Sequence, residues 1–103
     1  MIARVWSARA TPMQSLEYLE HLRSHVLPVV REVDGYAGAT LLQREVSGEV
    51  EIVVTTWWWS LDAIRAFAGD DQEAAVVAGV AASMLSQFDQ RVRHYDLVVQ
   101  DEV

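Results

Sequence analysis

The chain has 103 residues, of which 51% are hydrophobic and four are tryptophan, and its formal net charge is −7. A chain of this length is expected to form one domain, residues 1–103, and this much large apolar surface favours self-association. The acidic charge argues against nucleic acid and anionic membranes as partners. The absence of cysteine excludes disulfides and thiolate metal ligands, so we expect a cytoplasmic protein.

The N-terminal third predicts a strand followed by a long amphipathic helix. Residues 2–9 alternate as a strand does, unlike a signal peptide. Thr11 then supplies an N-cap and Pro12 the first helical residue. Leucines and valines recur at helical spacing over 16–33, and Pro28 should kink the helix before Asp34-Gly35 ends it.

Two histidines on this helix have a spacing that is able to hold zinc. His21 and His25 lie four residues apart, and Glu17 precedes them by one turn. At about 100° per residue, both histidines lie well away from the apolar stripe, so we expect them to face solvent. We therefore expect no bound metal.

The middle of the chain predicts a hairpin and a short helix. Residues 36–46 and 49–59 are strand-like runs separated by Ser47-Gly48, a dipeptide that favours a tight turn. Ser60 caps a helix over 61–68, which Gly69 ends.

The C-terminal third predicts a helix and a last strand. The helix is expected to start at Asp70-Asp71, which we interpret as its cap, and to run to about Phe88, followed by a strand over 92–100. The apolar run 74–85 is far shorter than the ~20 residues needed to span a membrane, so no membrane partner is expected.

The order β-α-β-β-α-β is that of an α+β ferredoxin-like sandwich, in which helices cover one face of an antiparallel sheet. Large apolar residues occupy both the odd-numbered and the even-numbered strand positions, which point to opposite faces of the sheet. Trp57 and Trp59 lie on one side and Trp58 on the other. Because the helices cover only one face, a second copy should cover the other, which predicts a homodimer.

Four segments resemble the antibiotic biosynthesis monooxygenase family of dimeric α+β barrels. They are MIARVW at 1–6, DGYAG at 34–38, WWSLDAIRAFAG at 58–69 and VRHYD at 92–96. The resemblance implies a dimeric barrel with a pocket between helices and sheet in each subunit. It also implies oxygenation of aromatic substrates by molecular oxygen without metal or flavin, so no cofactor is expected.

The heme-degrading branch of this family is similar in fold but has its own set of residues. It uses an Asn on the first strand, a Trp on the helix after the third strand and a His beyond it. The corresponding places here hold about Ser7, Phe67 and Val77. None of the three matches, which argues against heme degradation.

His94 is the candidate catalytic base, because oxygen attack on a phenol or anthrone needs a base that works near neutral pH. Tyr95 is the fallback donor. The alternative is a structural histidine that holds the last strand in register.

Trp58 is the first choice for the pocket, since a tryptophan can stack on a flat substrate or simply pack in the core. The other substrate-binding candidates are Trp6, Ser7, Tyr36 and Phe67.

The predicted function is a cofactor-independent monooxygenase that acts on a small aromatic or polyketide-like molecule in an apolar pocket. The alternative is a noncatalytic dimeric binding or stress-response module for a small apolar ligand. A pocket that holds His94 beside a Tyr or Arg would favour the enzyme, and one lined only by Ala, Val and Trp would favour the binder. The sequence contains no Gly-rich phosphate loop, nucleophile elbow or paired-carboxylate signature, which argues against nucleotide, esterase and glycosidase chemistry.

Overall fold

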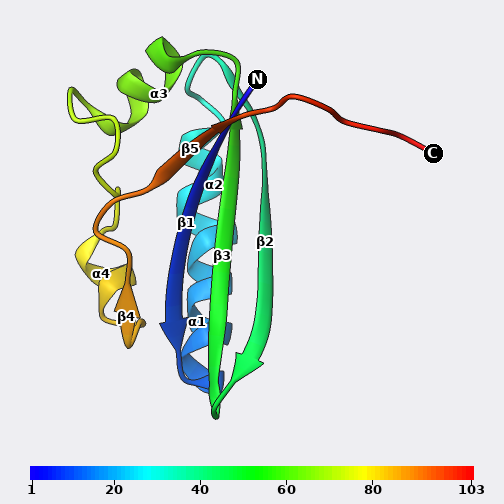
Figure 1. Cartoon of the computed structure of the whole chain (residues 1–103). Helices are drawn as coiled ribbons and strands as arrows, with labels where there is room; N and C mark the ends of the chain where they lie inside the picture. Colours follow the sequence, from blue (N-terminus) through cyan, green and yellow to red (C-terminus); the bar gives the residue numbers. More distant parts are fainter.

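The computed structural model describes residues 1–103 as an antiparallel sheet with helices on one face (Figure 1). Its elements are β1 (Ile2–Ala10), α1 (Pro12–His21), η1 (Leu22–Val26), α2 (Leu27–Val30), β2 (Tyr36–Val46), β3 (Glu49–Trp58), α3 (Leu61–Ala68), α4 (Gly79–Ala82), β4 (Gln87–Phe88) and β5 (Arg93–Asp96). The strand order is β2-β3-β1, and the two short strands β4 and β5 share the other edge of β1. This confirms the expected α+β ferredoxin-like arrangement.

The three long strands form as the sequence predicts. β1 pairs with β3 along its whole length, from Ile2 opposite Trp58 to Ala10 opposite Val50. β2 and β3 form the expected hairpin, and both turn residues, Ser47 and Gly48, have positive φ angles of 53° and 81°. This backbone matches the right-handed twist of the flanking strands, which explains why a Ser-Gly dipeptide connects them.

The first helical run begins at the predicted cap and changes character before Pro28. The Thr11 hydroxyl accepts a hydrogen bond from the Gln14 amide at 3.1 Å, and Pro12 occupies the first turn. Residues 22–26 (η1) form a π-helical turn that leads into α2. Because Pro28 has no N–H and its ring crowds the preceding turn, the helix widens there.

The π-helical turn contradicts the expectation that both histidines of this helix face solvent. His21 is buried, with 9% of its surface exposed, whereas Leu16 and Val29 are each 67% exposed. The predicted apolar stripe assumes uniform helical spacing across the proline. The extra residue per turn in η1 shifts the helix phase, so that the buried face before it contains Tyr18 and His21. His25 is exposed, as predicted.

The predicted third helix is wrong over most of its length. Only residues 79–82 are α-helical, and Gln87–Phe88 form β4 against β1. Residues 73–75 instead bond to the chain before β5, with Ala75 N donating to Gln90 O and Val92 N to Glu73 O. We name residues 71–82 the cover segment. Its tertiary bonds replace helical i to i+4 bonds, and β-branched valines and Gly79 lower the helix propensity of its middle.

The last strand is shorter than predicted. β5 spans Arg93–Asp96, and the final bond that continues it joins Leu97 N to Met1 O at 2.9 Å. Residues 98–103 extend away from the sheet (Figure 1). Strand hydrogen bonding ends where β1, its partner, begins.

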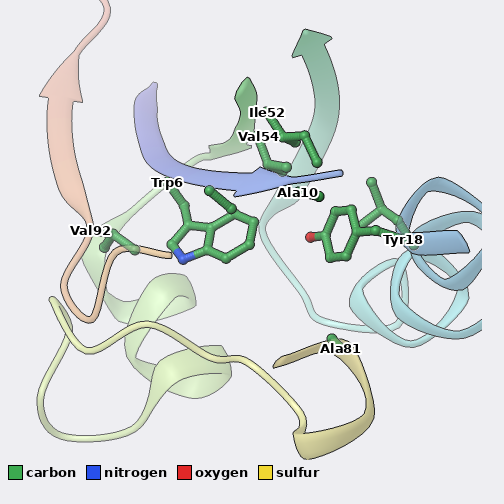
Figure 2. Packing of buried hydrophobic residues seen from close by; sticks show 9 residues of the cluster. Trp6, Ala10, Tyr18, Ile52, Val54, Ala81 and Val92 are labelled. Carbon is green, nitrogen blue, oxygen red and sulfur yellow. The ribbon is translucent and has the colours of Figure 1, made fainter. Parts of the chain in front are cut away.

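The core lies between the sheet and the helical run. Even-numbered residues of β1 and β3 face the helices, and Trp6, Ile52 and Val54 form one buried cluster with Tyr18 (Figure 2). Trp58, Ile64 and Val30 belong to a second cluster near α3. No helix of the structure is long and apolar enough to cross a membrane.

Candidate functional site

An apolar cavity of about 90 Å³ lies between the sheet, the first helical run, α3 and the cover segment. Thirteen of its sixteen lining residues are hydrophobic. The lining consists of Arg4, Trp6, Tyr18, His21, Leu22, Val26, Leu27, Val30, Val54, Thr56, Phe67, Val76, Val77, Ala78, Ala81 and Val92. A concave apolar site with a few polar groups is the usual form of a small-molecule site.

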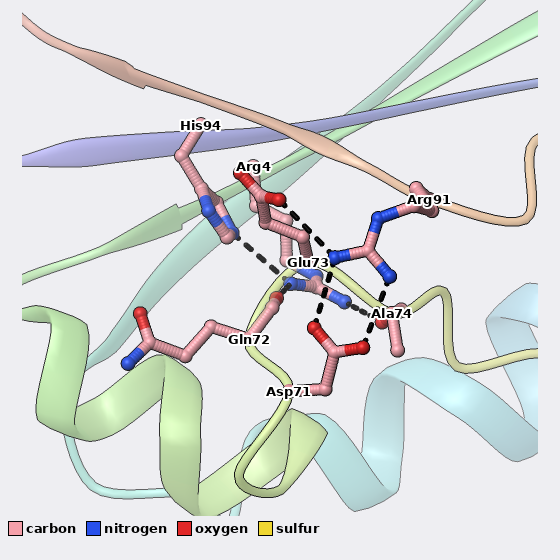
Figure 3. A network of polar contacts seen from close by, with 7 residues as sticks. All are labelled: Arg4, Asp71, Gln72, Glu73, Ala74, Arg91 and His94. Carbon is pink, nitrogen blue, oxygen red and sulfur yellow. Dashed lines mark hydrogen bonds and ion pairs between the residues drawn. The ribbon is translucent and has the colours of Figure 1, made fainter.

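Arg4 supplies the cationic side chain of this cavity. It lies in β1, two residues before Trp6 and with the same parity, and only 4% of its surface is exposed. Its Nη1 donates to Gln72 O, and its Nη2 donates to Ala74 O at 2.7 Å (Figure 3). Burial lowers the pKa of Arg4 to about 10, so the guanidinium is still charged at neutral pH.

His94 is the cross-strand neighbour of Arg4. Its Nε2 lies 3.0 Å from Arg4 Nη1 (Figure 3). Because a guanidinium only donates, Nε2 accepts this bond, and His94 is therefore neutral with its proton on Nδ1. Burial lowers the pKa of His94, the Arg4 charge lowers it further, and Glu73 opposes the shift. His94 contacts Arg4 but does not itself line the cavity.

The backbone carbonyls that receive Arg4 are held in place by a second arginine. Arg91 donates two hydrogen bonds of 3.0 Å to Asp71 and one of 3.2 Å to Glu73, on either side of Gln72 (Figure 3). These bonds lower the pKa of the Asp71 carboxyl. Asp71 is thus an ion-pair partner that anchors the cover segment and not the cap of a long helix.

The predicted aromatic residues divide into two layers. Trp6 and Phe67 line the cavity, and the Trp6 indole donates to Asp89 O at 3.0 Å. Trp58 is fully buried behind them: its ring stacks on Phe67 at 5.4 Å, and Tyr36 meets it edge-on at 5.5 Å. Trp58 and Tyr36 therefore support the wall formed by Phe67 and do not touch the cavity.

Two predicted site residues lie on the other face of the sheet. Ser7 has the opposite parity from Trp6, and its backbone bonds to Asp89. Tyr95 is 54% exposed and is paired with Ala3 across β1. The structure does not bring either residue to the cavity.

The sequence analysis does not identify most of the lining residues, and Arg4, Tyr18 and His21 are the ones among them with titratable groups. Strand parity with Trp6 could have identified Arg4. Tyr18 packs its ring 5.9 Å from Trp6, and burial raises its pKa to about 12. His21 lies one turn after Tyr18, and its Nε2 is buried without a hydrogen-bond partner.

The electrostatics of the cavity are simple. Arg4 is the charged lining residue, and Tyr18, His21 and Thr56 add polar atoms. The His21 and His25 rings lie 5.5 Å apart, but no group of three or more His, Cys, Asp or Glu side chains is arranged so that it could hold a metal ion. The site can therefore exclude water from an apolar ligand and offer it one guanidinium.

Comparison with known proteins agrees with this fold. The sequence profile described as antibiotic biosynthesis monooxygenase matches residues 1–79. No curated protein matches the chain.

Several solved structures are similar over nearly the whole chain. A putative antibiotic biosynthesis monooxygenase from Bacillus cereus has 15% identity and a TM-score of 0.70, with 99% of this chain and 97% of that one covered. The heme-degrader MhuD from Mycobacterium tuberculosis, with two hemes bound, has 21% identity and a TM-score of 0.62, at coverages of 99% and 100%. A monooxygenase from the gene ActVA-Orf6 of Streptomyces coelicolor, in complex with nanaomycin D, has 19% identity and a TM-score of 0.65, at coverages of 99% and 89%. At these identities the likeness establishes the fold alone.

Proposed function

Because the chain belongs to the antibiotic biosynthesis monooxygenase family, we propose that it is a cofactor-independent monooxygenase that oxidises a small aromatic or polyketide-like molecule in this cavity. The observation that carries the proposal is the neutral His94 hydrogen-bonded to Arg4, a cation that lines a mainly hydrophobic cavity. A base next to a fixed positive charge is suited to making and stabilising a substrate anion.

In the proposed reaction an anthrone-like substrate loses a proton, and the anion passes electrons to molecular oxygen. A carbon–oxygen bond forms, and protonation gives a hydroperoxide at that carbon. Loss of water then converts the original CH₂ group to C=O. One oxygen atom stays in the product and the other leaves as water. The substrate supplies all the electrons, so the balance needs no metal, flavin or external reductant.

His94 would accept the substrate proton at Nε2. The hydroxyl of the substrate's enol form would take the place of Arg4 Nη1 at this lone pair, and Arg4 would then stabilise the oxyanion. The lowered pKa of His94 keeps its base form populated at neutral pH. Because the side chain is partly exposed, it can return the proton to water.

A noncatalytic binding module remains the second candidate, and three observations favour it. His94 does not line the cavity, and its lone pair is already bonded to Arg4. Thirteen of sixteen lining residues are hydrophobic, which suits storage of an apolar ligand. In this alternative His94 positions Arg4 and takes no part in proton transfer.

The homodimer also belongs to this proposal, because the outer face of the sheet carries large apolar side chains. Val5, Val53 and Trp57 share the parity that points away from the helices, and Leu42 beside Val53 is 61% exposed. A second sheet packed here would bury these side chains in an interface larger than the usual ~1,600 Å². Light scattering at micromolar concentration should give twice the chain mass, and Trp57→Glu should give monomers. A monomeric wild type contradicts the dimer.

The enzyme is tested by turnover of anthrone under ¹⁸O₂. We expect one labelled oxygen in the product, activity that survives chelation, and a ~10²–10⁴-fold loss in His94→Ala with the dimer intact. Tyr95→Phe is the control, since Tyr95 lies on the other face, and it should keep full turnover. Full turnover in His94→Ala removes His94 from the mechanism. A drop of about 1 kcal/mol in stability, with activity proportional to folded protein, identifies a structural histidine.

A further inference from the structure

Arg4 carries a buried charge that no acidic side chain balances. Five of the other arginines form ion pairs, namely Arg9, Arg44, Arg65, Arg91 and Arg93. Arg4 forms none, although it is among the most buried side chains. A buried cation without a counterion is costly, because its desolvation is not repaid by a nearby negative charge. Its lowered pKa reflects this cost.

The hydrogen bonds of Arg4 are also incomplete. Nη1 donates to Gln72 O and His94 Nε2, and Nη2 donates to Ala74 O, so all three acceptors are neutral. A guanidinium has five N–H donors. One donor on Nη2 and one on Nε therefore have no partner in the chain. Donors on adjacent guanidinium nitrogens are the arrangement that binds a carboxylate or another anionic oxygen through two bonds.

The rest of the cavity indicates what should be attached to that oxygen. The Arg4 guanidinium carbon lies 5.7 Å from the centre of the Phe67 ring, and Trp6 lies two residues along the same strand. Aromatic side chains near a fixed cation favour a flat ring. The cavity volume of about 90 Å³ is below the roughly 150 Å³ known to admit benzene, so the wall must move outward before a ring can enter.

The cover segment provides a wall that can move. Val76 and Val77 line the cavity, yet their backbone N–H and C=O groups make no hydrogen bonds within the chain. Val76 is exposed on its outer side. Few tertiary bonds are typical of segments that open locally, so this stretch can move while Arg91 keeps residues 71–73 anchored.

We propose that the cavity selects aromatic anions: a small ring system whose ionised oxygen, carboxylate or phenolate, binds the free edge of Arg4. The inference rests on the proposed function only in taking this cavity as the substrate site. It specifies the substrate class, because a neutral aromatic of the same shape would leave the Arg4 charge uncompensated. The net charge of −7 repels anions at long range, so Arg4 must supply the selectivity locally.

The test is direct binding by calorimetry, with acids compared with amides of the same shape. Benzoate and 2-naphthoate should bind about 10- to 100-fold more tightly than benzamide and 2-naphthamide, the range expected for a charge-assisted hydrogen bond. A second arm with 4-nitrophenol, above and below its own pKa, distinguishes phenolate from carboxylate recognition. Amides that bind as tightly as the acids, with no gain for the phenolate, overturn the inference.

Variants locate the selectivity. Arg4→Met should abolish the preference for acids, whereas Arg23→Met removes the same charge from an exposed helical position and should keep it. If Arg4→Met does not fold, the wild-type comparison of acids with amides decides alone. Tight binding of the anions, together with no oxidation of anthrone, would refute the proposed monooxygenase and leave this inference standing. Oxidation of anthrone without preference for anions would do the reverse.

Discussion

Filling the cavity should stabilise the protein and abolish binding, and Ala81→Leu is the change that does so. Ala81 lies in α4, lines the cavity, and sits across the Trp6 and Tyr18 rings from the strands (Figure 2). At about 24 cal/mol per Å³, a 90 Å³ cavity costs about 2 kcal/mol of stability. A leucine that fills part of it should recover about 1 kcal/mol, or roughly 4–8 °C in melting temperature for a domain of this size.

The assay combines urea denaturation with calorimetric titration of 2-naphthoate. Ala66→Leu is the matched control, because it makes the same substitution on the exposed face of α3 and should change neither quantity by much. A folded Ala81→Leu variant that binds the ligand as well as wild type would refute the assignment of the binding site. A loss of stability of more than about 1 kcal/mol would show that the cavity is too rigid or too small to accept the added atoms.

Three further predictions concern stability. The pKa of His94 is lowered in the folded protein, so the contribution of this residue to stability is complete above the ordinary pKa of 6.5 and is lost as pH falls through the folded pKa. In His94→Gln the melting temperature should therefore depend less on pH over that acidic range. An unchanged pH profile of the melting temperature would contradict the shift. His21→Leu should raise stability by about 1 kcal/mol in thermal melts by removing the unpartnered Nε2, and a lower melting temperature would indicate a bond that the structure lacks. Gly35→Ala should lower the free energy of unfolding in urea by more than about 1 kcal/mol, because φ is +91° and the new Cβ would lie 2.5 Å from Ala63 Cβ. Gly48→Ala, where φ is also positive but the space is open, should lower it by less. Equal losses in the two variants would contradict the steric argument.

The part of the fold that the sequence predicts is the part determined by local signals. Thr11-Pro12, Ser47-Gly48 and Ser60 begin or connect elements through bonds within a few residues, and each appears where expected. Alternation likewise places Trp58 on the opposite side of β3 from Trp57, and the structure shows that Trp6 and Trp58 lie on the helix side. Such signals do not depend on the rest of the chain.

The features that were missed depend on contacts between distant residues. His21 is buried because the π-helical turn before Pro28 alters the helix phase, and no uniform periodicity can represent that change. The cover segment is alanine-rich and was expected to be helical. Its conformation is instead set by Arg91 and by the backbone of residues 90–92, which lie close only after β1 and β5 have paired. Local propensity gave way to these tertiary bonds.

Arg4 connects these long-range contacts to function. Its guanidinium holds the carbonyls of Gln72 and Ala74, and so stabilises the extended conformation that replaces the predicted helix. It also places its remaining donors beside the aromatic wall of the cavity. If the residue served only to hold the cover, a neutral hydrogen-bond donor would do so without the cost of burying a charge. The charge therefore points to an anionic ligand.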